Sequence, residues 1–542
     1  MDKFELTHKI KQKAIELGFS KVGIAKAEKL LDEAERLRQW LERKYHADML
    51  WLKNNFEKRI NPENILPDAK SIIVVGLNYF QKIPPAKKEQ GKISIYALGK
   101  DYHIVLKSKL ENLLNFIKEI CPNVNAKIYV DTGPVMEKVW AVRAGLGWIG
   151  KHTNLITKEF GSWIFLGVLI CDLELEYDEP MADFCGKCTR CINACPTSAI
   201  VEPYVLDSNK CISYWTIEFK GENFPEGIKK KFGNLIFGCD ICQEVCPWNI
   251  KFQKETTVEE FKAFEHNINP DLFKLSNLTV DEFNLLYKFS PIKRAKFFGF
   301  MRNVKNAISN LTLEKILNLD FECAIFDLDG VVADTFLFHF SSWSEICRRY
   351  GRDLSLEEFR KIVFGRKGEE SAKILFDGKI SDEEAKEIGV EVDRIFRVIA
   401  KGQLKEVDGA IDFIKMLREN GIKTALATSA PFENVELIFN ELSLNGLFDV
   451  VVSAKDVKRG KPEPDIFILA GSKLNCNPRE CIVFEDSIAG LISAKRAGML
   501  AVGVETTLTK IELSNYADLT IKNFLEIFEN VKQNRKEKDA TN

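Results

Sequence analysis

Long apolar stretches, a leader peptide and internal repeats are all missing from this chain of 542 residues. No apolar run reaches the roughly 18–20 residues that a membrane-spanning helix needs. The first twenty residues mix lysine with glutamate, and they contain neither the apolar core of a secretory signal nor paired arginines. We therefore expect a cytoplasmic protein without a membrane partner.

Neither sign of charge dominates, since the formal net charge is −2. The first 320 residues carry a small positive excess and the remainder a negative one. This excess permits a nucleic-acid partner, but a mixed solvated surface explains it equally well. With 45% hydrophobic and 29% charged residues, the composition is that of a folded globular protein. The length exceeds one ordinary core and predicts two to four domains.

Cysteine is scarce outside one short window, because eight of the 14 cysteines lie between Cys185 and Cys246. Cytoplasmic proteins rarely build disulfides, so such clustering indicates metal ligands. The first group follows the C-x2-C-x2-C-x3-C-P pattern of bacterial ferredoxins, in which the fourth cysteine binds a neighbouring cluster. The predicted ligands of one [4Fe–4S] cluster are Cys185, Cys188, Cys191 and Cys246, and those of the other are Cys195, Cys211, Cys239 and Cys242.

Two other kinds of cysteine-rich protein fit this window less well. A zinc ribbon uses two C-x2-C pairs, whereas this window has eight cysteines and two Cys-Pro endings. A small ferredoxin would place about two residues where this chain has the long gap between Cys211 and Cys239. The gap favours a specialised reductase over a simple electron carrier.

Helical and strand patterns alternate over residues 1–180 and return after residue 320, which predicts an α/β multidomain fold. The residues between, rich in cysteine, proline and glycine, are typical of a ferredoxin-like module organised by metal. The predicted division is a catalytic α/β domain at 1–175, a two-[4Fe–4S] module at 176–255, a helical segment at 256–318, and a Rossmann-like domain at 319–542 with a helical cap at about 338–403.

Asp131 follows a predicted strand and opens a Gly-Pro turn, and a glycine-rich stretch comes shortly after it. Ligand sites in α/β sheets are favoured at the carboxyl ends of strands, and glycines allow a large ligand to approach the backbone. Taken alone, such an aspartate is more often a helix cap than a catalyst.

Several segments in this order resemble the epoxyqueuosine reductase family over roughly residues 1–315. They are VDTGPVMEK at 130–138, GLGWIGKHTN at 145–154, GSWIFLG at 161–167 and the two cysteine groups, together with ALGKDYH at 97–103 and the stretch from Ser290 to Asn303.

The resemblance implies a cobalamin cofactor, two [4Fe–4S] clusters and an external electron donor. The implied reaction removes the epoxide oxygen from epoxyqueuosine in the tRNA anticodon loop and gives queuosine. Asp131 would donate a proton to that oxygen, and an apolar corrinoid face would raise its pKa. The implied cobalamin contacts are Arg59, His152, Ser162 and Trp163. The Asp-x-His-x-x-Gly pattern that supplies an axial histidine is absent after Asp101, so we expect cobalamin without one.

A basic, aromatic stretch is the candidate tRNA surface. One predicted helix carries Lys293, Arg294, Lys296, Arg302 and Lys305 with Phe297 and Phe298. An amphipathic helix with a solvated basic face explains the pattern equally well.

Four motifs in the C-terminal part resemble the haloacid-dehalogenase-like phosphohydrolases, in their β-phosphoglucomutase-like branch, from residue 321 to about 530. They are FDLDG at 326–330, LATS at 426–429, GKPEPD at 460–465 and VFEDS at 483–487. The resemblance implies that Asp327 attacks phosphorus and that Asp329 handles the leaving-group proton. The implied Mg²⁺ ligands are Asp327, Asp329, Glu485 and Asp486, and the implied phosphate contacts are Thr428, Ser429 and Lys461.

The substrate of this second part stays open between a phosphatase and a phosphomutase reaction on a small phosphorylated metabolite. His339 and Trp343 stand where mutase relatives have comparable residues, but the cap loop at 364–368 does not match the mutase sugar-binding loop. We therefore expect a monomeric bifunctional fusion. The alternatives are a reductive dehalogenase, disfavoured by the missing twin-arginine signal, an electron carrier without its own substrate, and a phosphohydrolase half unrelated to tRNA.

Overall fold

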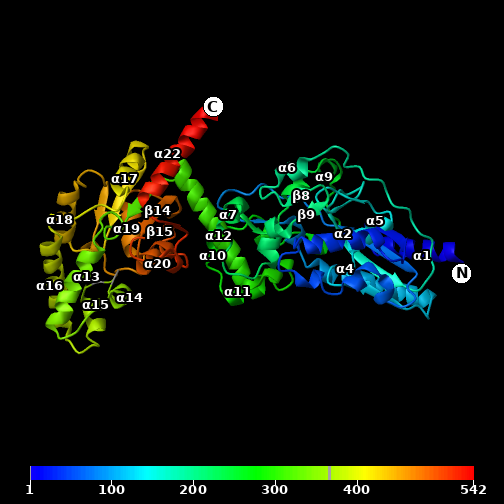
Figure 1. The fold of residues 1–542 in the computed structure, drawn as a ribbon, viewed down its shortest axis with the longest axis horizontal. Coiled ribbons are helices and arrows are strands. Elements are labelled where there is room, and N and C mark those ends of the chain that lie inside the picture. Colours follow the sequence, from blue (N-terminus) through cyan, green and yellow to red (C-terminus); the bar gives the residue numbers. More distant parts are fainter. Residues whose placement is uncertain (1, 364–365, 367, 542) are drawn as a thin grey trace. The chain divides into compact units, whose positions relative to one another are not determined.

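The computed structural model of the chain describes residues 2–363, 366 and 368–541. The chain divides into two compact units, residues 1–308 and 309–542, and the division falls inside one helix, α12 (Lys296–Asn318). Figure 1 shows the elements of each unit in chain order. Of the cap loop that the sequence singled out, Phe364, Gly365 and Lys367 lie outside the described residues. Among the helices described, none combines the length and the apolar character that crossing a membrane requires.

A four-stranded sheet in the order β1-β2-β7-β4 organises the first unit. Every neighbouring pair is antiparallel. Asp131 follows the carboxyl end of a strand, β4, as expected, but the rule for parallel sheets does not explain its place because this sheet is antiparallel. The strands are β1 (Lys21–Lys26), β2 (Ser71–Asn78), β4 (Ala126–Tyr129) and β7 (Ile164–Cys171).

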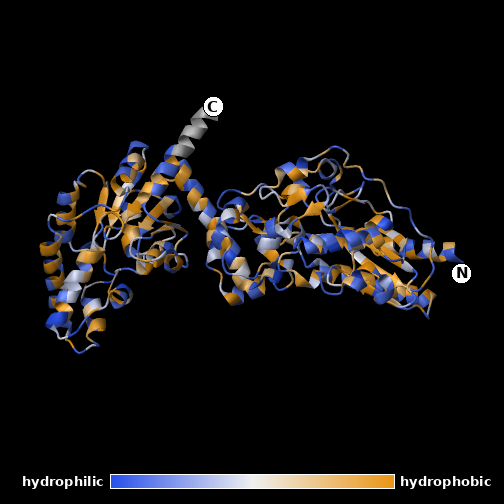
Figure 2. Cartoon of the chain, viewed as in Figure 1, coloured by the Kyte–Doolittle hydropathy of each residue, from blue (hydrophilic) through white to orange (hydrophobic). Residues whose placement is uncertain are grey.

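Both faces of this sheet are covered, which explains why β2 is buried at every position. Alternate side chains of a strand point to opposite faces. Ile73 and Val75 belong to the core that includes α1 (Lys3–Glu16) and α4 (Tyr102–Ile120), whereas Ile72 and Val74 belong to the core that includes α5 (Glu137–Arg143). Figure 2 colours the strands of the two units mostly as hydrophobic.

The cysteine-rich segment has only short elements. They are α6 (Arg190–Ala194), the hairpin of β8 (Ile200–Glu202) and β9 (Val205–Leu206), α8 (Ile241–Glu244) and α9 (Pro247–Phe252). Cys246 caps α9, and Pro247 opens it at a position where no backbone N–H is needed. The proline after the last cysteine thus ends the loop by starting a helix.

The long gap between Cys211 and Cys239 has a core of its own. Phe224, Phe232 and Leu235 are buried in it together with Ile212. Strand β10 (Leu235–Phe237) then pairs with β3 (Lys92–Ile93) of the preceding domain. The gap therefore fastens the cysteine-rich segment to the α/β part of the same unit.

The predicted basic helix is interrupted, so the expectation of one continuous helix is wrong. Pro291–Ala295 forms a 3-10 helix, η9, and Lys296 adopts a left-handed φ of 58° before α12 continues. The basic stretch is thus divided between two helical segments. Two shorter helices precede it, α10 (Leu272–Ser276) and α11 (Val280–Leu286).

The second unit contains a six-stranded parallel sheet in the order β13-β12-β11-β14-β15-β16. The central strand β11 leads directly into Asp327. The strands are β11 (Cys323–Phe326), β12 (Lys423–Ala427), β13 (Val450–Val452), β14 (Cys481–Glu485), β15 (Leu500–Val504) and β16 (Leu519–Ile521). The helices that follow these strands are α17 (Ala410–Glu419), α18 (Phe432–Leu442), α19 (Asp465–Lys473), α20 (Ile488–Arg496), α21 (Lys510–Leu513) and α22 (Phe524–Thr541).

A helical insertion separates β11 from α17 and has its own hydrophobic core, in which Trp343, Phe359 and Val392 are buried. It consists of α13 (Phe336–Arg349), α14 (Leu356–Ile362), α15 (Gly368–Leu375) and α16 (Asp382–Ala400). An insertion that packs on itself can act as a cap over the sheet.

One disulfide lies outside the cysteine-rich segment and was not predicted. Cys323 and Cys476 are joined in the second unit, with their Cα atoms 6.6 Å apart. That separation lies within the range for disulfide-bonded residues.

Candidate active sites

Asp131 lies immediately beyond β4, where its backbone adopts a left-handed φ of 56°. The Tyr102 hydroxyl donates a hydrogen bond to Asp131 Oδ2 at 2.9 Å, and His103 Nε2 lies 3.4 Å from the same oxygen. Both partners belong to the first turn of α4, whose N-terminus is capped by Asp101. The Asp131 side chain is still about half exposed, at 52%, so its free oxygen can face a ligand.

The Asp131 carboxyl has a pKa below its usual range in the protein alone, and a rise caused by an adjacent corrinoid face stays a prediction. Burial acts to raise this pKa, but the nearby His103 and the hydrogen bond from Tyr102 stabilise the ionised form more strongly. The pKa of His103 is raised to about 9, because hydrogen bonds to Asp101 and Asp131 outweigh the desolvation that would lower it. At neutral pH the site therefore holds an ionised Asp131 beside a protonated His103.

Two further charged groups beside Asp131 have buried atoms without a partner among the described residues. These atoms are Arg59 Nε and Glu137 Oε1. Burial raises the pKa of Glu137 to about 7 and lowers that of Arg59, and the charges of both act on Asp131. Buried polar atoms normally find a hydrogen-bond partner. The two groups therefore fit a ligand with amide groups at its edge, such as cobalamin.

The other predicted cobalamin contacts lie in different surroundings. The Ser162 backbone N–H donates to Asn249 Oδ1 at 2.6 Å and its hydroxyl donates to Gln243 Oε1 at 2.8 Å. Trp163 is only 1% exposed in the core, and His152 lines a cavity among cysteines. The structure thus brings Arg59 to Asp131, while a cofactor contact by the other three stays a prediction.

The eight clustered cysteines form two groups of four. One cavity of about 170 Å³ is lined by Cys185, Cys188, Cys191 and Cys246. In the other group, burial raises the pKa of Cys242 well above its usual range, and the neighbouring thiols Cys239, Cys211 and Cys195 raise it further. Four sulfur donors around a common centre fit a [4Fe–4S] cluster. The grouping matches the one predicted from spacing.

The charge of Lys138 interacts with both Asp131 and the second cysteine group, which its place in a motif did not indicate. Its ammonium donates to Thr153 O at 3.0 Å and to Asn154 Oδ1 at 2.8 Å. Burial lowers the pKa of Lys138, while the charges of Asp131 and Cys242 both act on this ammonium to raise it. Lys138 is therefore a cation within electrostatic reach of Asp131 and of the second cysteine group.

The predicted basic surface is only partly a surface. Arg302 donates from Nη1 to the carbonyl oxygens of Gly221 at 2.6 Å and Phe219 at 3.0 Å, and its guanidinium lies 4.4 Å from the centre of the Phe224 ring. This arginine therefore holds the gap between Cys211 and Cys239 in place, and its assignment to an exposed cationic face is wrong. The exposed members of the set are Lys293, Arg294, Lys296, Lys305 and Phe298.

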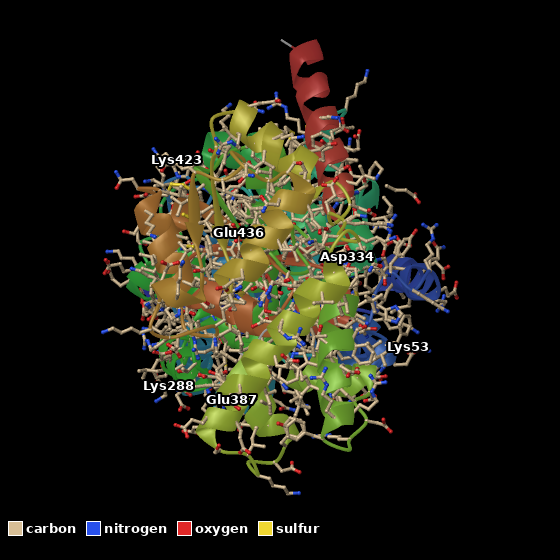
Figure 3. The ribbon with its side chains drawn as sticks, turned by 90° about the vertical axis from the view of Figure 1, so that its left-hand side faces the viewer. Lys53, Lys288, Asp334, Glu387, Lys423 and Glu436 are labelled. Carbon is tan, nitrogen blue, oxygen red and sulfur yellow. A yellow bond between two sulfur atoms is a disulfide. The ribbon has the colours of Figure 1, made fainter. Side chains whose placement is uncertain are left out.

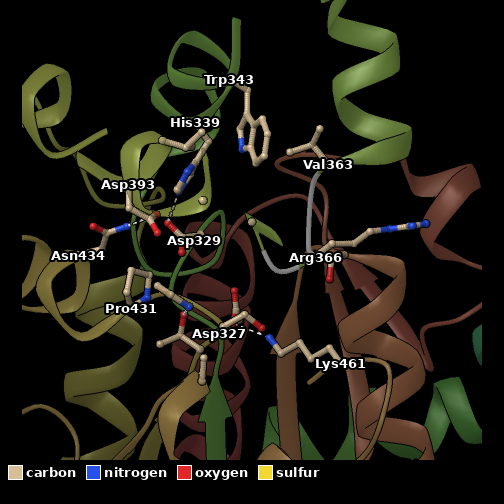
Figure 4. Close-up of a pocket in the computed structure, with 18 of the residues that line it drawn as sticks. Asp327, Asp329, His339, Trp343, Val363, Arg366, Asp393, Pro431, Asn434 and Lys461 are labelled. Atoms are coloured by element: carbon tan, nitrogen blue, oxygen red, sulfur yellow. Dashed lines mark hydrogen bonds and ion pairs between the residues drawn. The ribbon is translucent and has the colours of Figure 1, made fainter. Parts of the chain in front are cut away.

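In the second unit, Asp327 at the end of β11 forms a buried ion pair. Lys461 Nζ lies 2.6 Å from Asp327 Oδ1 and 2.5 Å from Glu485 Oε1, as Figure 4 shows for the first pair. Burial raises the pKa of Asp327 to about 7, and Lys461 opposes this effect. The second oxygen of Glu485 accepts hydrogen bonds from the Ser487 N–H and hydroxyl, so both oxygens of Glu485 have protein partners.

Asp329 is held by the cap and by the chain that leads to it. His339 Nε2 of α13 lies 3.0 Å from Asp329 Oδ1, and the Thr335 hydroxyl donates to the same oxygen at 2.7 Å. Burial would raise the pKa of Asp329, but His339 and Thr335 lower it overall. Asp329 thus has His339, a histidine of the helical insertion whose pKa is raised by this carboxylate against the effect of burial, directly beside it.

A cavity of about 250 Å³ lies over these carboxylates. Its wall includes Thr428, Ser429 and Asp486, as predicted, and the cap residues Trp343 and Arg366. Five carboxylates line it, at Asp327, Asp329, Asp393, Glu485 and Asp486, against Lys461, Arg366 and His339. This excess of buried oxygen donors fits a divalent cation such as Mg²⁺.

Sequence reasoning missed a polar group on the cap side of this cavity. Asn434 donates to Asp393 Oδ1 at 2.9 Å and accepts from Arg397 Nη1 at 2.7 Å. Asp393 and Asn434 both line the cavity (Figure 4). They belong to different helices, α16 and α18, and no motif links the two.

Three family models match parts of the chain. The first, Epoxyqueuosine reductase QueG, DUF1730, matches residues 59–132, and a 4Fe-4S double cluster binding domain matches residues 184–249. A haloacid dehalogenase-like hydrolase matches residues 324–504.

Named relatives resemble the N-terminal part. The epoxyqueuosine reductase of Cellulophaga algicola is 47% identical over 302 residues, which cover 54% of this chain and 95% of the relative. The epoxyqueuosine reductase of Synechocystis sp. is 46% identical over 278 residues, which cover 51% of this chain and 94% of the relative. A crystal structure of epoxyqueuosine reductase with an epoxyqueuosine-modified tRNA-Tyr stem loop has a TM-score of 0.54 and 27% identity, and the match covers 73% of this chain and 100% of that one.

Proposed function

The chain belongs to the epoxyqueuosine reductase family, and we propose that its first unit reduces epoxyqueuosine to queuosine at the tRNA wobble position. The relatives at 46–47% identity are named epoxyqueuosine reductases, and the match covers 94–95% of their length. A similar structure was solved with a modified tRNA stem loop. The observation that carries the proposal is Asp131, which is half exposed and lies beside Tyr102 and His103. Since the substrate is tRNA, we place the reaction in the cytoplasm.

Cobalamin, when bound, would supply the electron chemistry at the epoxide, with electrons from an external donor entering through the two [4Fe–4S] clusters. Arg59 and Glu137 would hold its polar edge, because their buried atoms Nε and Oε1 have no partner among the described residues. Lys138 holds the loop at Thr153 and Asn154, and its charge interacts with those of Asp131 and Cys242.

Proton delivery is the task of the chain's own residues. Opening an epoxide leaves an alkoxide, which needs a proton at neutral pH. Asp131 rests ionised and His103 rests protonated. The proton passes from His103 Nε2 to Asp131 Oδ2, over 3.4 Å, and from the Asp131 carboxyl to the substrate oxygen. The hydrogen bond of Tyr102 keeps the carboxyl oriented during both transfers.

The exposed side chains around η9 and the start of α12 would bind the anticodon arm. Lys293, Lys296 and Lys305 offer cations for phosphates, and Phe298, which is 80% exposed, offers a face on which a base can stack. The charge of Arg294 acts on Asp131, so this cation lies on the side of the reacting group.

The second unit carries a different activity. We propose that it is a Mg²⁺-dependent phosphatase or phosphomutase that acts on a small phosphorylated metabolite. Asp327 attacks phosphorus, and Lys461 neutralises it and the transferred group. Asp329, held by His339 and Thr335, exchanges a proton with the leaving oxygen. A cavity of about 250 Å³ admits a small metabolite but not a macromolecule.

The reductase proposal is tested by loading the full chain with iron, sulfide and cobalamin under anaerobic conditions, together with a strong reductant. The substrate is an anticodon stem loop that carries epoxyqueuosine. We expect conversion to queuosine, measured by nucleoside mass spectrometry. If the loaded protein oxidises the reductant but leaves epoxyqueuosine unchanged, the electron-carrier alternative replaces the proposal.

A further inference from the structure

Three cysteines converge in the second unit, away from the residues assigned above. The sulfur atoms of Cys323, Cys476 and Cys481 all lie within 4.8 Å of one another. Cys323 and Cys481 begin the neighbouring strands β11 and β14, where they are paired in register, and Cys476 comes from the loop after α19. The disulfide between Cys323 and Cys476 is the yellow bond near Lys423 in Figure 3.

This convergence is separate from the phosphohydrolase site. Cys323 opens β11, whereas Asp327 follows its last residue. At a rise of about 3.3 Å per residue, the four steps between them span roughly 13 Å. The cysteines therefore lie at the amino ends of the parallel strands, and the catalytic carboxylates lie at the carboxyl ends.

The three sulfur atoms differ in their access to solvent. Cys323 and Cys481 are fully buried, whereas Cys476 is partly exposed. The Cys481 thiol donates a hydrogen bond to the Asn477 carbonyl oxygen at 3.3 Å. Burial also raises the pKa of Cys481 to about 12, which makes it a resting thiol. A reagent from solvent thus meets Cys476 first.

We propose that Cys323, Cys476 and Cys481 form a thiol–disulfide site that reacts with small-molecule disulfides through Cys476. The Cys476 thiolate attacks one sulfur of the small disulfide, and the other half leaves as a thiol. Cys323 then attacks the Cys476 sulfur of this mixed disulfide, and the second half leaves as a thiol. Two protein thiols are oxidised, one small disulfide is reduced to two thiols, and both protons end on the released thiols.

The oxidised form ties the first strand of the sheet to a loop 153 residues further along. Closing so long a loop restricts the unfolded chain and stabilises the folded unit. Cys481 is the alternative partner, because its sulfur lies within 4.8 Å of both others. Loss of Cys323 should therefore move the bond to Cys476 and Cys481.

The test equilibrates the anaerobic full chain in glutathione buffers of increasing disulfide content. Free thiols are then alkylated, and the peptides are read by mass spectrometry. We expect alkylation of Cys323 and Cys476 to disappear together as their linked peptide forms. The thermal midpoint of the second unit should rise by about 5–15 °C in the oxidised form. In Cys323→Ser the linked peptide should join Cys476 to Cys481.

Cys347→Ser serves as the matched control, since Cys347 is a fully buried cysteine of the cap with no assigned role. It should leave the linked peptide and the thermal shift unchanged. Alkylation of both Cys323 and Cys476 in the most oxidising buffer would overturn the proposal. So would a Cys323→Ser variant in which Cys476 carries only glutathione. Zinc or copper bound at one per chain and lost in Cys481→Ser would instead assign the three cysteines to a metal.

Discussion

Asp131 in the first unit and Asp327 in the second are both aspartates that follow a strand, yet their surroundings differ in every respect. Asp131 is half exposed, accepts a hydrogen bond from the Tyr102 hydroxyl and lies near His103. These two neighbours lower its pKa, against the effect of burial. Asp327 is buried, and desolvation raises its pKa to about 7 in spite of Lys461. Under the proposed functions, the same side chain serves as a proton carrier in one unit and as a nucleophile dependent on cations in the other.

The difference shows that each role rests on neighbours more than on the aspartate itself. A carboxylate with a low pKa can deliver protons only if another group supplies them, and His103 is placed to do so. A buried nucleophile must be ionised to attack, and Lys461 together with a divalent cation favours that form. Substitutions at the two aspartates and at their neighbours therefore test the comparison in both units.

The largest effect is expected from Asp327→Asn, because an amide cannot form the phosphoryl-enzyme intermediate. We expect phosphatase activity toward small phosphate esters to fall by about 10⁴-fold or more. Queuosine formation by the same protein should be unchanged. The exposed Asp412→Asn should alter neither activity. Equal loss of both activities would contradict the assignment of separate sites.

A smaller but still large effect is expected from Lys461→Met. The substitution leaves Asp327 and Glu485 buried without their shared cation. Breaking a buried pair in this way typically costs about 3–5 kcal/mol. Hydrogen exchange of β11 and β14, followed by mass spectrometry without added Mg²⁺, should become faster in proportion. The exposed Lys473→Met should exchange like the parent. Unchanged protection in Lys461→Met would show that the pair does not stabilise the unit.

In the first unit, His103→Gln should reduce the rate of queuosine formation by about 10²-fold, as for a lost proton donor. The parent rate should fall as pH rises through about 9, because His103 gives up its proton there. This fall should be missing in the variant, whereas the exposed His8→Gln should keep it. A variant that is slower but retains the fall would assign His103 a purely structural role.

The smallest effect concerns Glu137, whose pKa is raised from 4.5 to about 7 by burial. A carboxyl with a raised pKa stabilises the fold only while it is protonated, so the parent should lose stability as pH rises from about 4.5 through 7. Glu137→Gln should gain about 1–3 kcal/mol relative to the parent between pH 5 and 8. The thermal midpoints of the proteins without added cobalamin measure this gain. A pH-independent difference would contradict the shift.

Several of these features could be predicted because they depend on spacing along the chain. The C-x2-C-x2-C-x3-C-P pattern is local, and the structure brings its cysteines together as the spacing indicates. The motif around Asp327 and the lysine at position 461 were likewise recognisable, although 134 residues separate them. A motif can be recognised from its own residues, even where only the fold brings two motifs into contact.

Other features depend on contacts between distant segments and leave no local pattern. The hydrogen bond of Tyr102 and the nearby His103, which lower the pKa of Asp131, had no sign in the sequence. The Phe224 ring and three carbonyl oxygens hold an arginine that looked like part of a basic face. Likewise Cys323 and Cys476 are neighbours only because β11 and the loop before β14 meet in a parallel sheet.

The central claim is that Asp131 delivers the proton in epoxyqueuosine reduction. The most direct measurement is nucleoside mass spectrometry of tRNA from a bacterium without its own epoxyqueuosine reductase, carrying this gene or its Asp131→Asn variant. Asp172→Asn is the control, because Asp172 follows β7 at the opposite end of the sheet. Among the contacts described, its side chain accepts a hydrogen bond only from the Asn125 backbone N–H. We predict queuosine with the parent and the control, and epoxyqueuosine alone with Asp131→Asn. Queuosine at parent levels in Asp131→Asn would contradict the account.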